Sequence, residues 1–320
     1  MTIRTLTLSP ALDYSLTVKD KLTIGAINRT TKESFAPGGK GINVSIILKR
    51  LGYTSIALGF LSGFTGEYVE KLLAKEGLQT DFIHIAGITR INVKIDGKVE
   101  TAINGSGPNA TDDDLEKLFK KIEQSESGDI LVMSGQIPPT LPSNTYEKIL
   151  ERISDRDVMT VVDSTGSLLT DSLKFHPFLI KPNKEEMCEI LGVDDLFTDG
   201  EIITGARHLQ DMGAKNVLVS LGKQGALLVD EAGNIYKRSA PIGHVKSTVG
   251  AGDSMVAGFL KGYLETHDYG VALAYGVAIG SATAFARNLA NKDKMLAAIE
   301  KVKKQKKLSH VTNVTNLRRH

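Results

Sequence analysis

The sequence predicts an α/β fold in which helices cover both faces of a mostly parallel central sheet and a small second β-sheet projects from it. From about residue 128 onward, short β-branched runs alternate with stretches of helical periodicity, a pattern typical of a parallel sheet buried on both faces. In the first hundred residues, apolar and polar side chains alternate along several short segments. This alternation favours half-exposed antiparallel strands.

The predicted parallel strands all end at polar or glycine residues. The strands are 129–133, 159–162, 178–180 and 216–219, which lead into Ser134, Asp163, Lys181 and Ser220, and the predicted helices lie near 143–153, 184–191 and 201–212. In sheets of this kind ligands bind beyond the carboxyl ends of the strands. We therefore expect the functional site at that edge of the sheet.

The alternating segments of the N-terminal part are predicted to form the small sheet. They are 4–8, 15–18, 29–35, 91–95 and 99–103. The last two flank Asp96-Gly97, and Asp-Gly between alternating runs is a strong hairpin signal. A lid over the active site, or a contact between two copies of the chain, would be a natural use of such a sheet.

Composition narrows the class of protein. Hydrophobic residues make up 41% of the 320 residues and charged residues 24%, which is typical of a folded globular protein, and the length allows one or two domains. Cys188 is the single cysteine, so we expect no internal disulfide, no thiolate metal site and a reducing compartment. The N-terminus lacks the pattern of a secretory leader and no apolar run is long enough to span a membrane. A cytoplasmic protein without a membrane partner is expected.

The C-terminal tail is basic. Residues 301–320 carry seven Lys or Arg and no acidic residue, although the net charge of the chain is only +2. The tail has no aromatic side chains on which bases could stack, so we expect a solvated terminal helix and no nucleic-acid partner.

A glycine-rich turn at residues 247–253 leads directly into a predicted amphipathic helix. The turn reads Ser-Thr-Val-Gly-Ala-Gly-Asp and ends at Asp253. Free backbone N–H groups at a helix N-terminus bind anions, and glycine lets an anion approach the backbone closely. A carboxylate beside such a turn can accept a hydroxyl proton while the amides hold phosphoryl oxygens. The plainer alternative is that Asp253 only caps the helix.

A second glycine turn opens another predicted helix. It spans 37–43 and reads Pro-Gly-Gly-Lys-Gly-Ile-Asn. Lys40 and Asn43 lie within it, which a turn that only reverses the chain would not require. Two anion-binding turns suggest that the donor and the acceptor both carry oxygen-rich groups. Neither turn matches the Walker or dinucleotide-binding pattern.

With these two turns the sequence resembles the PfkB, or ribokinase-like, carbohydrate kinases. Both signatures are present, at 38–43 and 250–253, and the likeness covers essentially the whole chain. It implies a single domain over 1–320 with a three-layer α/β/α fold and a β lid from about 13–36 and 90–104. Segments 9–13, 89–94 and 134–139 are similar to the bacterial 1-phosphofructokinase and tagatose-6-phosphate kinase branch, except that Ser9 replaces the usual Asn.

The resemblance implies a role for each matching residue. Asp253 would be the catalytic base, with the amides of Gly250, Ala251 and Gly252 as an anion hole. The sugar phosphate would contact Asp13, Gly38, Gly39, Lys40, Asn43, Arg90 and Ser134. The ATP site would be lined by Lys181, Asn183, Ser220, Gly222, Gly225 and Ser281, and Asn183 and Glu186 would organise Mg²⁺ through water.

The expected reaction is ATP-dependent phosphorylation of fructose 1-phosphate to fructose 1,6-bisphosphate. A phosphate on the acceptor requires cations, and the arginine fork matches it, so Arg90 is preferred and Arg29 is a second candidate. The two ends of fructofuranose are similar, so tagatose 6-phosphate and fructose 6-phosphate stay open as acceptors. An unphosphorylated sugar or nucleoside, and a sugar-phosphate sensor without catalysis, are further alternatives. A homodimer through the lid is the expected assembly.

Overall fold

The computed structural model describes residues 1–304, 309 and 310. Its main sheet has eleven strands in the order β15-β14-β13-β12-β11-β10-β9-β1-β4-β5, with β6 paired to β4. The strands are β1 (Ile3–Thr7), β4 (Ser55–Leu61), β5 (Gln79–Thr80), β6 (Ile83–His84), β9 (Ile130–Ser134), β10 (Met159–Asp163), β11 (Leu179–Ile180), β12 (Asn216–Ser220), β13 (Ala226–Val229), β14 (Ile235–Arg238) and β15 (Ser309–His310). All strand pairs in this sheet are parallel except β12–β13, β13–β14 and β14–β15, which are antiparallel.

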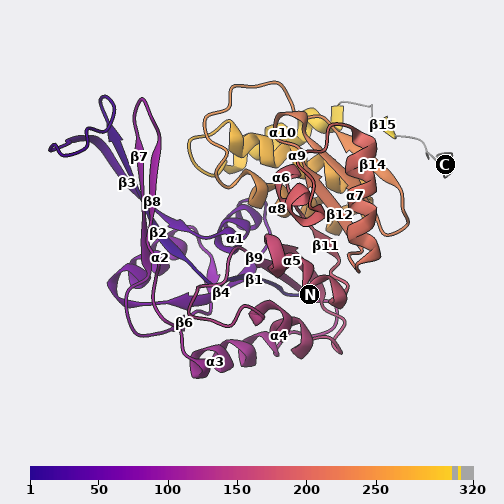
Figure 1. Cartoon of the computed structure of the whole chain (residues 1–320), viewed down its shortest axis with the longest axis horizontal. Coiled ribbons are helices and arrows are strands. Elements are labelled where there is room, and N and C mark those ends of the chain that lie inside the picture. The colour runs from indigo at the N-terminus through magenta and orange to yellow at the C-terminus, as the bar shows by residue number, and fades with distance from the viewer. Residues whose placement is uncertain (305–308, 311–320) are drawn as a thin grey trace.

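Helices cover both faces of this sheet (Figure 1). One face carries α3 (Asp112–Ile122), α4 (Thr145–Arg152), α5 (Gly166–Thr170), α6 (Lys184–Leu191) and α7 (Asp199–Asp211), and the other carries α1 (Lys40–Arg50), α8 (Ala251–Thr266), α9 (Tyr269–Ala284) and α10 (Lys292–Lys304). Each helix layer shares a buried apolar cluster with alternate side chains of the central strands, such as Leu131 toward one layer and Val132 toward the other. The predicted mostly parallel α/β sheet, and the four parallel strands after residue 128, are confirmed.

The small sheet contains β3 (Thr30–Gly38), β2 (Ala11–Val18), β7 (Arg90–Asp96) and β8 (Thr101–Asn104), in that order. It projects from the body of the molecule, as Figure 1 shows. The predicted hairpin is confirmed, because β7 and β8 pair antiparallel across Asp96-Gly97, with Ile95 opposite Thr101. At its base the sheet meets α1 and α2 (Gly63–Lys75) through a small apolar cluster that includes Leu12.

Two details of the predicted small sheet were wrong. Segment 4–8 does not belong to it, because β1 lies in the centre of the main sheet between β4 and β9. The polar side chain that suggested a half-exposed strand, Arg4, is held by Asp129 at 2.6 Å. The pair β2–β7 is parallel rather than antiparallel, since the chain returns to the main body between these strands and enters the small sheet twice from the same end.

The described residues contain no helix that is long and apolar enough to span a membrane. Lys301 and Lys303 of the basic tail lie in α10. Most of the tail, including Lys306, Lys307, Arg318 and Arg319, lies outside the described residues.

Candidate functional site

A cavity of about 1070 Å³ lies where the carboxyl ends of the main strands meet the small sheet. The N-termini of α1 and α8 open into it, as do the last residues of β10 and β12 and the residues that follow β11 and β12. Of the predicted site residues it is lined by Asp13, Gly39, Lys40, Asn43, Arg90, Lys181, Asn183, Glu186, Ser220, Gly222, Gly225, Gly250, Ala251, Gly252, Asp253 and Ser281. Two turns that are 210 residues apart in the sequence therefore contribute to one site.

Asp253 lies in the first turn of α8 with only 5% of its surface exposed. Its Oδ2 accepts a hydrogen bond of 2.7 Å from Asn43 Nδ2 on α1. None of the described side chains caps the N-terminus of α8. The capping role that sequence alone left open for Asp253 is thus not the one its carboxylate plays here.

Burial, together with the neighbouring charge of Asp163, raises the pKa of Asp253 to about 6. The hydrogen bond from Asn43 and the ammonium groups of Lys40 and Lys181 oppose this rise. A base is most useful when its pKa lies close to the working pH. The surroundings of Asp253 therefore suit a carboxylate that takes up a proton near neutrality.

The backbone beside Asp253 is open to a ligand. Gly250 has φ = 75°, a conformation that favours glycine, and α8 begins at the next residue. A Cβ at Gly252 would lie 3.2 Å from Lys181 Nζ, so glycine keeps this ammonium close to the first amides of the helix. The amides, the positive end of the helix and the lysine together favour a multiply charged anion.

Asp163 at the end of β10 is a site residue that the role assignment missed. Its Oδ1 accepts from Lys40 Nζ at 3.4 Å and forms an ion pair with Lys181, whose Nζ lies 3.3 Å away, while its buried Oδ2 has no partner among the described residues. Burial alone would lower the pKa of Lys40, but Asp163, Asp253 and Glu186 raise it, so this lysine remains charged. The sequence feature that could have identified Asp163 is its position at the end of a predicted strand.

The small sheet supplies the other wall of the cavity. Asp13 of β2 accepts from Asn92 Nδ2 at 3.0 Å and from Lys94 Nζ at 2.6 Å. Gly38 adjoins it, and a Cβ there would lie 2.6 Å from Asp13 Oδ1. Arg90 is anchored through the carbonyl oxygens of Ser9 and Pro10, at 2.9 and 3.4 Å. Desolvation lowers the pKa of Arg90, and the charge of Asp13 opposes this.

The opposite end of the cavity gathers the residues predicted for the nucleotide. Asn183 and Glu186 form a reciprocal cap at the start of α6, with bonds of 2.7 and 2.8 Å, and Asn183 also bridges to Ser220. Gly225 has φ = 96°, and a Cβ there would collide with the Arg238 carbonyl oxygen at 1.9 Å. Sequence reasoning missed the apolar wall at this end, formed by Ala240, Pro241, Ile242, Val245, Val277 and Phe285.

Three predicted sugar-phosphate residues, Gly38, Ser134 and Arg29, do not line the cavity. Ser134 is buried at the end of β9, and its hydroxyl has no partner among the described residues. Arg29 is exposed in the segment before β3. Alternation along 29–35 identified the strand, but β3 begins at Thr30 and Arg29 lies just before it.

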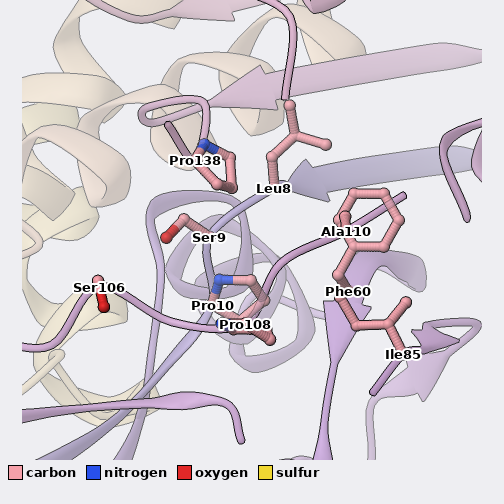
Figure 2. Close-up of a pocket in the computed structure, with 9 residues that line it drawn as sticks. All are labelled: Leu8, Ser9, Pro10, Phe60, Ile85, Ser106, Pro108, Ala110 and Pro138. Atoms are coloured by element: carbon pink, nitrogen blue, oxygen red, sulfur yellow. The ribbon is translucent and has the colours of Figure 1, made fainter. Parts of the chain in front are cut away.

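A second, much smaller cavity of about 10 Å³ lies behind Ser9 and Pro10 (Figure 2). Figure 2 shows Leu8, Phe60 and Ile85 on one side of it and Pro108 and Pro138 on others. This volume suits about one water molecule. It is too small for a sugar, so the large cavity is the site that we consider.

Comparisons with known proteins agree with this geometry. The family model of the pfkB family carbohydrate kinases matches residues 12–295. The 1-phosphofructokinase of Bacillus subtilis (strain 168) is 41% identical over 302 residues, which are 94% of this chain and 98% of that protein. The D-tagatose-1-phosphate kinase of Bacillus licheniformis is 36% identical over 293 residues, which are 92% of this chain and 96% of that protein.

The fold is also that of a solved kinase. The crystal structure of phosphofructokinase-2 from Escherichia coli in complex with substrates and products has a TM-score of 0.88 and 31% identity, and the match covers 95% of this chain and 100% of that one. The ribokinase-like fold and the predicted family are confirmed. This chain belongs to the pfkB family of carbohydrate kinases, and it is a phosphotransferase similar to 1-phosphofructokinase.

Proposed function

We propose that the protein transfers the γ-phosphoryl group of ATP to fructose 1-phosphate and forms fructose 1,6-bisphosphate. The observation that carries the proposal is the position of Asp253, a carboxylate with a pKa of about 6 beside the amides of Gly250 and Gly252 at the start of α8. The Ala251 amide of the same turn donates to the Thr248 carbonyl oxygen at 3.2 Å. A sensor that binds a sugar phosphate without catalysis would not need a buried carboxylate at this place.

The proposed step is an in-line displacement. The free primary hydroxyl of the sugar gives its proton to Asp253, its oxygen forms a bond to the γ-phosphorus, and the bond from this phosphorus to the bridging oxygen breaks to release ADP. The amides of the α8 turn hold the migrating oxygens, and Lys40 at the start of α1 and Lys181 after β11 supply positive charge. Asn43 orients the base through its 2.7 Å hydrogen bond.

Mg²⁺ is the metal that we propose for the site. In the part of the chain that the structure describes, no three His, Cys, Asp or Glu side chains are grouped to hold a metal, which suits an ion that keeps water and phosphate ligands. Glu186 lines the cavity, and Asp163 has a buried oxygen without a partner among the described residues. These two carboxylates and Asn183 would hold the ion through water. When bound, Mg²⁺ neutralises charge on the β- and γ-phosphate oxygens.

The acceptor is proposed to be a ketose phosphate. Arg90 supports this, because Nε and Nη2 reach carbonyl oxygens while the remaining N–H groups of its fork suit a phosphate. The names of the Bacillus relatives favour a 1-phosphate. Fructose 1-phosphate is therefore the first choice and tagatose 1-phosphate, rather than the tagatose 6-phosphate considered from sequence, is the alternative.

The small sheet is proposed to close over the sugar and to bind a second copy of the chain. Its cavity face is polar, whereas the other face carries Phe35 and Ile103, which are 44% and 60% exposed. Phe35 stacks on Tyr14 with ring centroids 4.3 Å apart. Sedimentation velocity should find a dimer that Ile103→Lys dissociates. A wild-type monomer at micromolar concentration would contradict this assembly.

The reaction is tested with purified protein, Mg-ATP and a panel of sugars in an assay coupled to ADP release. Fructose 1-phosphate should give the highest kcat/KM, followed by tagatose 1-phosphate, with fructose 6-phosphate, fructose and ribose far behind. Turnover of unphosphorylated sugars at a similar kcat/KM would overturn the substrate class. Tight sugar-phosphate binding without ADP release would favour a sensor instead.

A further inference from the structure

We propose that Asn92 and Lys94 are positioning and specificity-determining residues for the sugar, which act by holding the Asp13 carboxylate in one orientation. This inference rests on the proposed function and extends it to the choice between ketose epimers. Neither residue is among those that sequence reasoning placed in the site.

The two residues and Arg90 share one face of β7. Side chains at i, i+2 and i+4 of a strand lie on the same face and are about 7 Å apart along it, so Arg90, Asn92 and Lys94 form a row. In the parallel pair with β2, Asn92 lies opposite Asp13 and Arg90 lies opposite Ala11. The residue proposed for the phosphate and the residues that contact Asp13 are therefore held at fixed spacing.

Each oxygen of Asp13 has its own donor from this row. Asn92 Nδ2 donates to Oδ1 at 3.0 Å, and Lys94 Nζ donates to Oδ2 at 2.6 Å. The Asp13 side chain is 15% exposed and lines the cavity. With both oxygens fixed, the remaining lone pairs of the carboxylate point in fixed directions, and they are suited to accept hydroxyl groups of a sugar ring.

Asn92 destabilises the fold in a way that a residue with only a structural role would avoid. Its Oδ1 is buried and has no partner among the described residues, and an unpaired buried carbonyl destabilises a fold. The amide cannot be turned over to relieve this, because Oδ1 would then face Asp13, and a carboxylate offers no donor. The benefit of the amide at this position is its hydrogen bond to Asp13.

Fructose and tagatose differ only in the configuration at carbon 4, so they present neighbouring ring hydroxyls differently. A carboxylate that is free to rotate would adapt to both epimers. One that is held by two donors discriminates between them, as a site built to hydrogen-bond one hydroxyl arrangement leaves groups unpaired with the other. We therefore infer that the row on β7 sets the preference for one epimer.

The experiment compares Asn92→Leu and Lys94→Met with the controls Asn104→Leu and Lys32→Met. The two control residues are exposed and lie on the neighbouring strands β8 and β3 of the same sheet. Each site variant should raise KM for fructose 1-phosphate about tenfold, leave KM for ATP unchanged and move the ratio of kcat/KM for the two epimers toward one. Lys94→Arg should restore part of the loss. The controls should behave as wild type.

A double-mutant cycle shows whether both residues act through Asp13. In an Asp13→Asn background, adding Lys94→Met should lower kcat/KM for the sugar phosphate little further than Asp13→Asn does by itself. If turnover is too slow to measure, the calorimetric Kd for the sugar phosphate replaces kcat/KM. Thermal melting should find Asn92→Leu at least as stable as wild type. Fully additive losses of kcat/KM in the double variant, or an unchanged ratio of kcat/KM for the two epimers, would overturn this inference but not the proposed function. A wild-type protein inactive on every ketose phosphate would instead overturn the proposed function.

Discussion

Asn43 and Asp253 join the two glycine turns of the chain through one hydrogen bond of 2.7 Å, from the Asn43 amide to a buried carboxylate oxygen. The bond links the first turn of α1 to the first turn of α8, so the two helix N-termini that open into the cavity share a contact. It also fixes which oxygen of Asp253 remains for a substrate proton.

Gly252→Ala should lower kcat about 100-fold, because the added Cβ would lie 3.2 Å from Lys181 Nζ and would crowd the amides that we propose to hold the phosphoryl group. The matched control is Gly200→Ala on α7, where the nearest atom to an added Cβ is 3.8 Å away. The control should keep full activity and gain a little stability. Equal kcat values for the two variants would argue against an anion site at this turn.

Glu186→Gln should raise the Mg²⁺ concentration needed for half-maximal rate, because the carboxylate is proposed to hold the metal through water. Glu186 also caps α6, so a loss of stability is expected as well. Glu201 makes the same reciprocal cap on α7 with Thr198, and Glu201→Gln is therefore the control. Both variants should melt slightly earlier, but only Glu186→Gln should change the Mg²⁺ titration. A parallel change in both would remove Glu186 from the metal site.

The pH dependence of kcat should show an acidic limb near pH 6, the value to which burial and Asp163 raise the pKa of Asp253. The base is active when ionised, so the rate falls as pH drops through 6. Phosphate esters also titrate near pH 6, so a shift of the limb is the informative result. Asn43→Leu removes a hydrogen bond that lowers this pKa and should move the limb to higher pH. An unmoved limb would assign it to another group.

Asp253→Asn should make the protein more stable at pH 8. The pKa of Asp253 is about 6 in the folded protein, against 3.8 for an unperturbed aspartate, so wild-type stability is lost as pH rises from about 4 through 6. Asn carries no charge at any of these pH values. The free energy of unfolding, measured with urea, should be up to about 3 kcal/mol higher for the variant at pH 8 and similar below pH 4. A variant less stable at pH 8 would refute the buried-charge account.

The sequence was sufficient for the main architecture and for the two glycine turns that meet at the large cavity. The parallel strands were predictable because each is a buried β-branched run that ends at a polar residue, and the position of Asp253 beside a cavity was predictable because glycines before a helix let a ligand approach the backbone. The position of β1 was not predictable, since Arg4 gives this central strand the alternation of an edge. Its compensation by Asp129 comes from a residue 125 positions away.

The residues that sequence missed contribute through contacts across strands. Asp163 becomes the shared partner of Lys40 and Lys181 only when the fold brings the start of α1 to the carboxyl ends of β10 and β11. Asn92 and Lys94 reach Asp13 because of the register in which β7 pairs with β2. Arg29 and Ser134 matched the expected residue types but do not line the cavity, and no local sequence pattern reports whether a side chain reaches a cavity.

The most direct test of the account is the turnover number of Asp253→Asn with Mg-ATP and fructose 1-phosphate. The variant keeps the shape of the side chain and an oxygen for the Asn43 hydrogen bond, so calorimetric Kd values for both substrates should stay within a few-fold of wild type. The account predicts that kcat falls by about three orders of magnitude, because the proton acceptor is gone. A kcat within tenfold of wild type would contradict the role of Asp253 as the base.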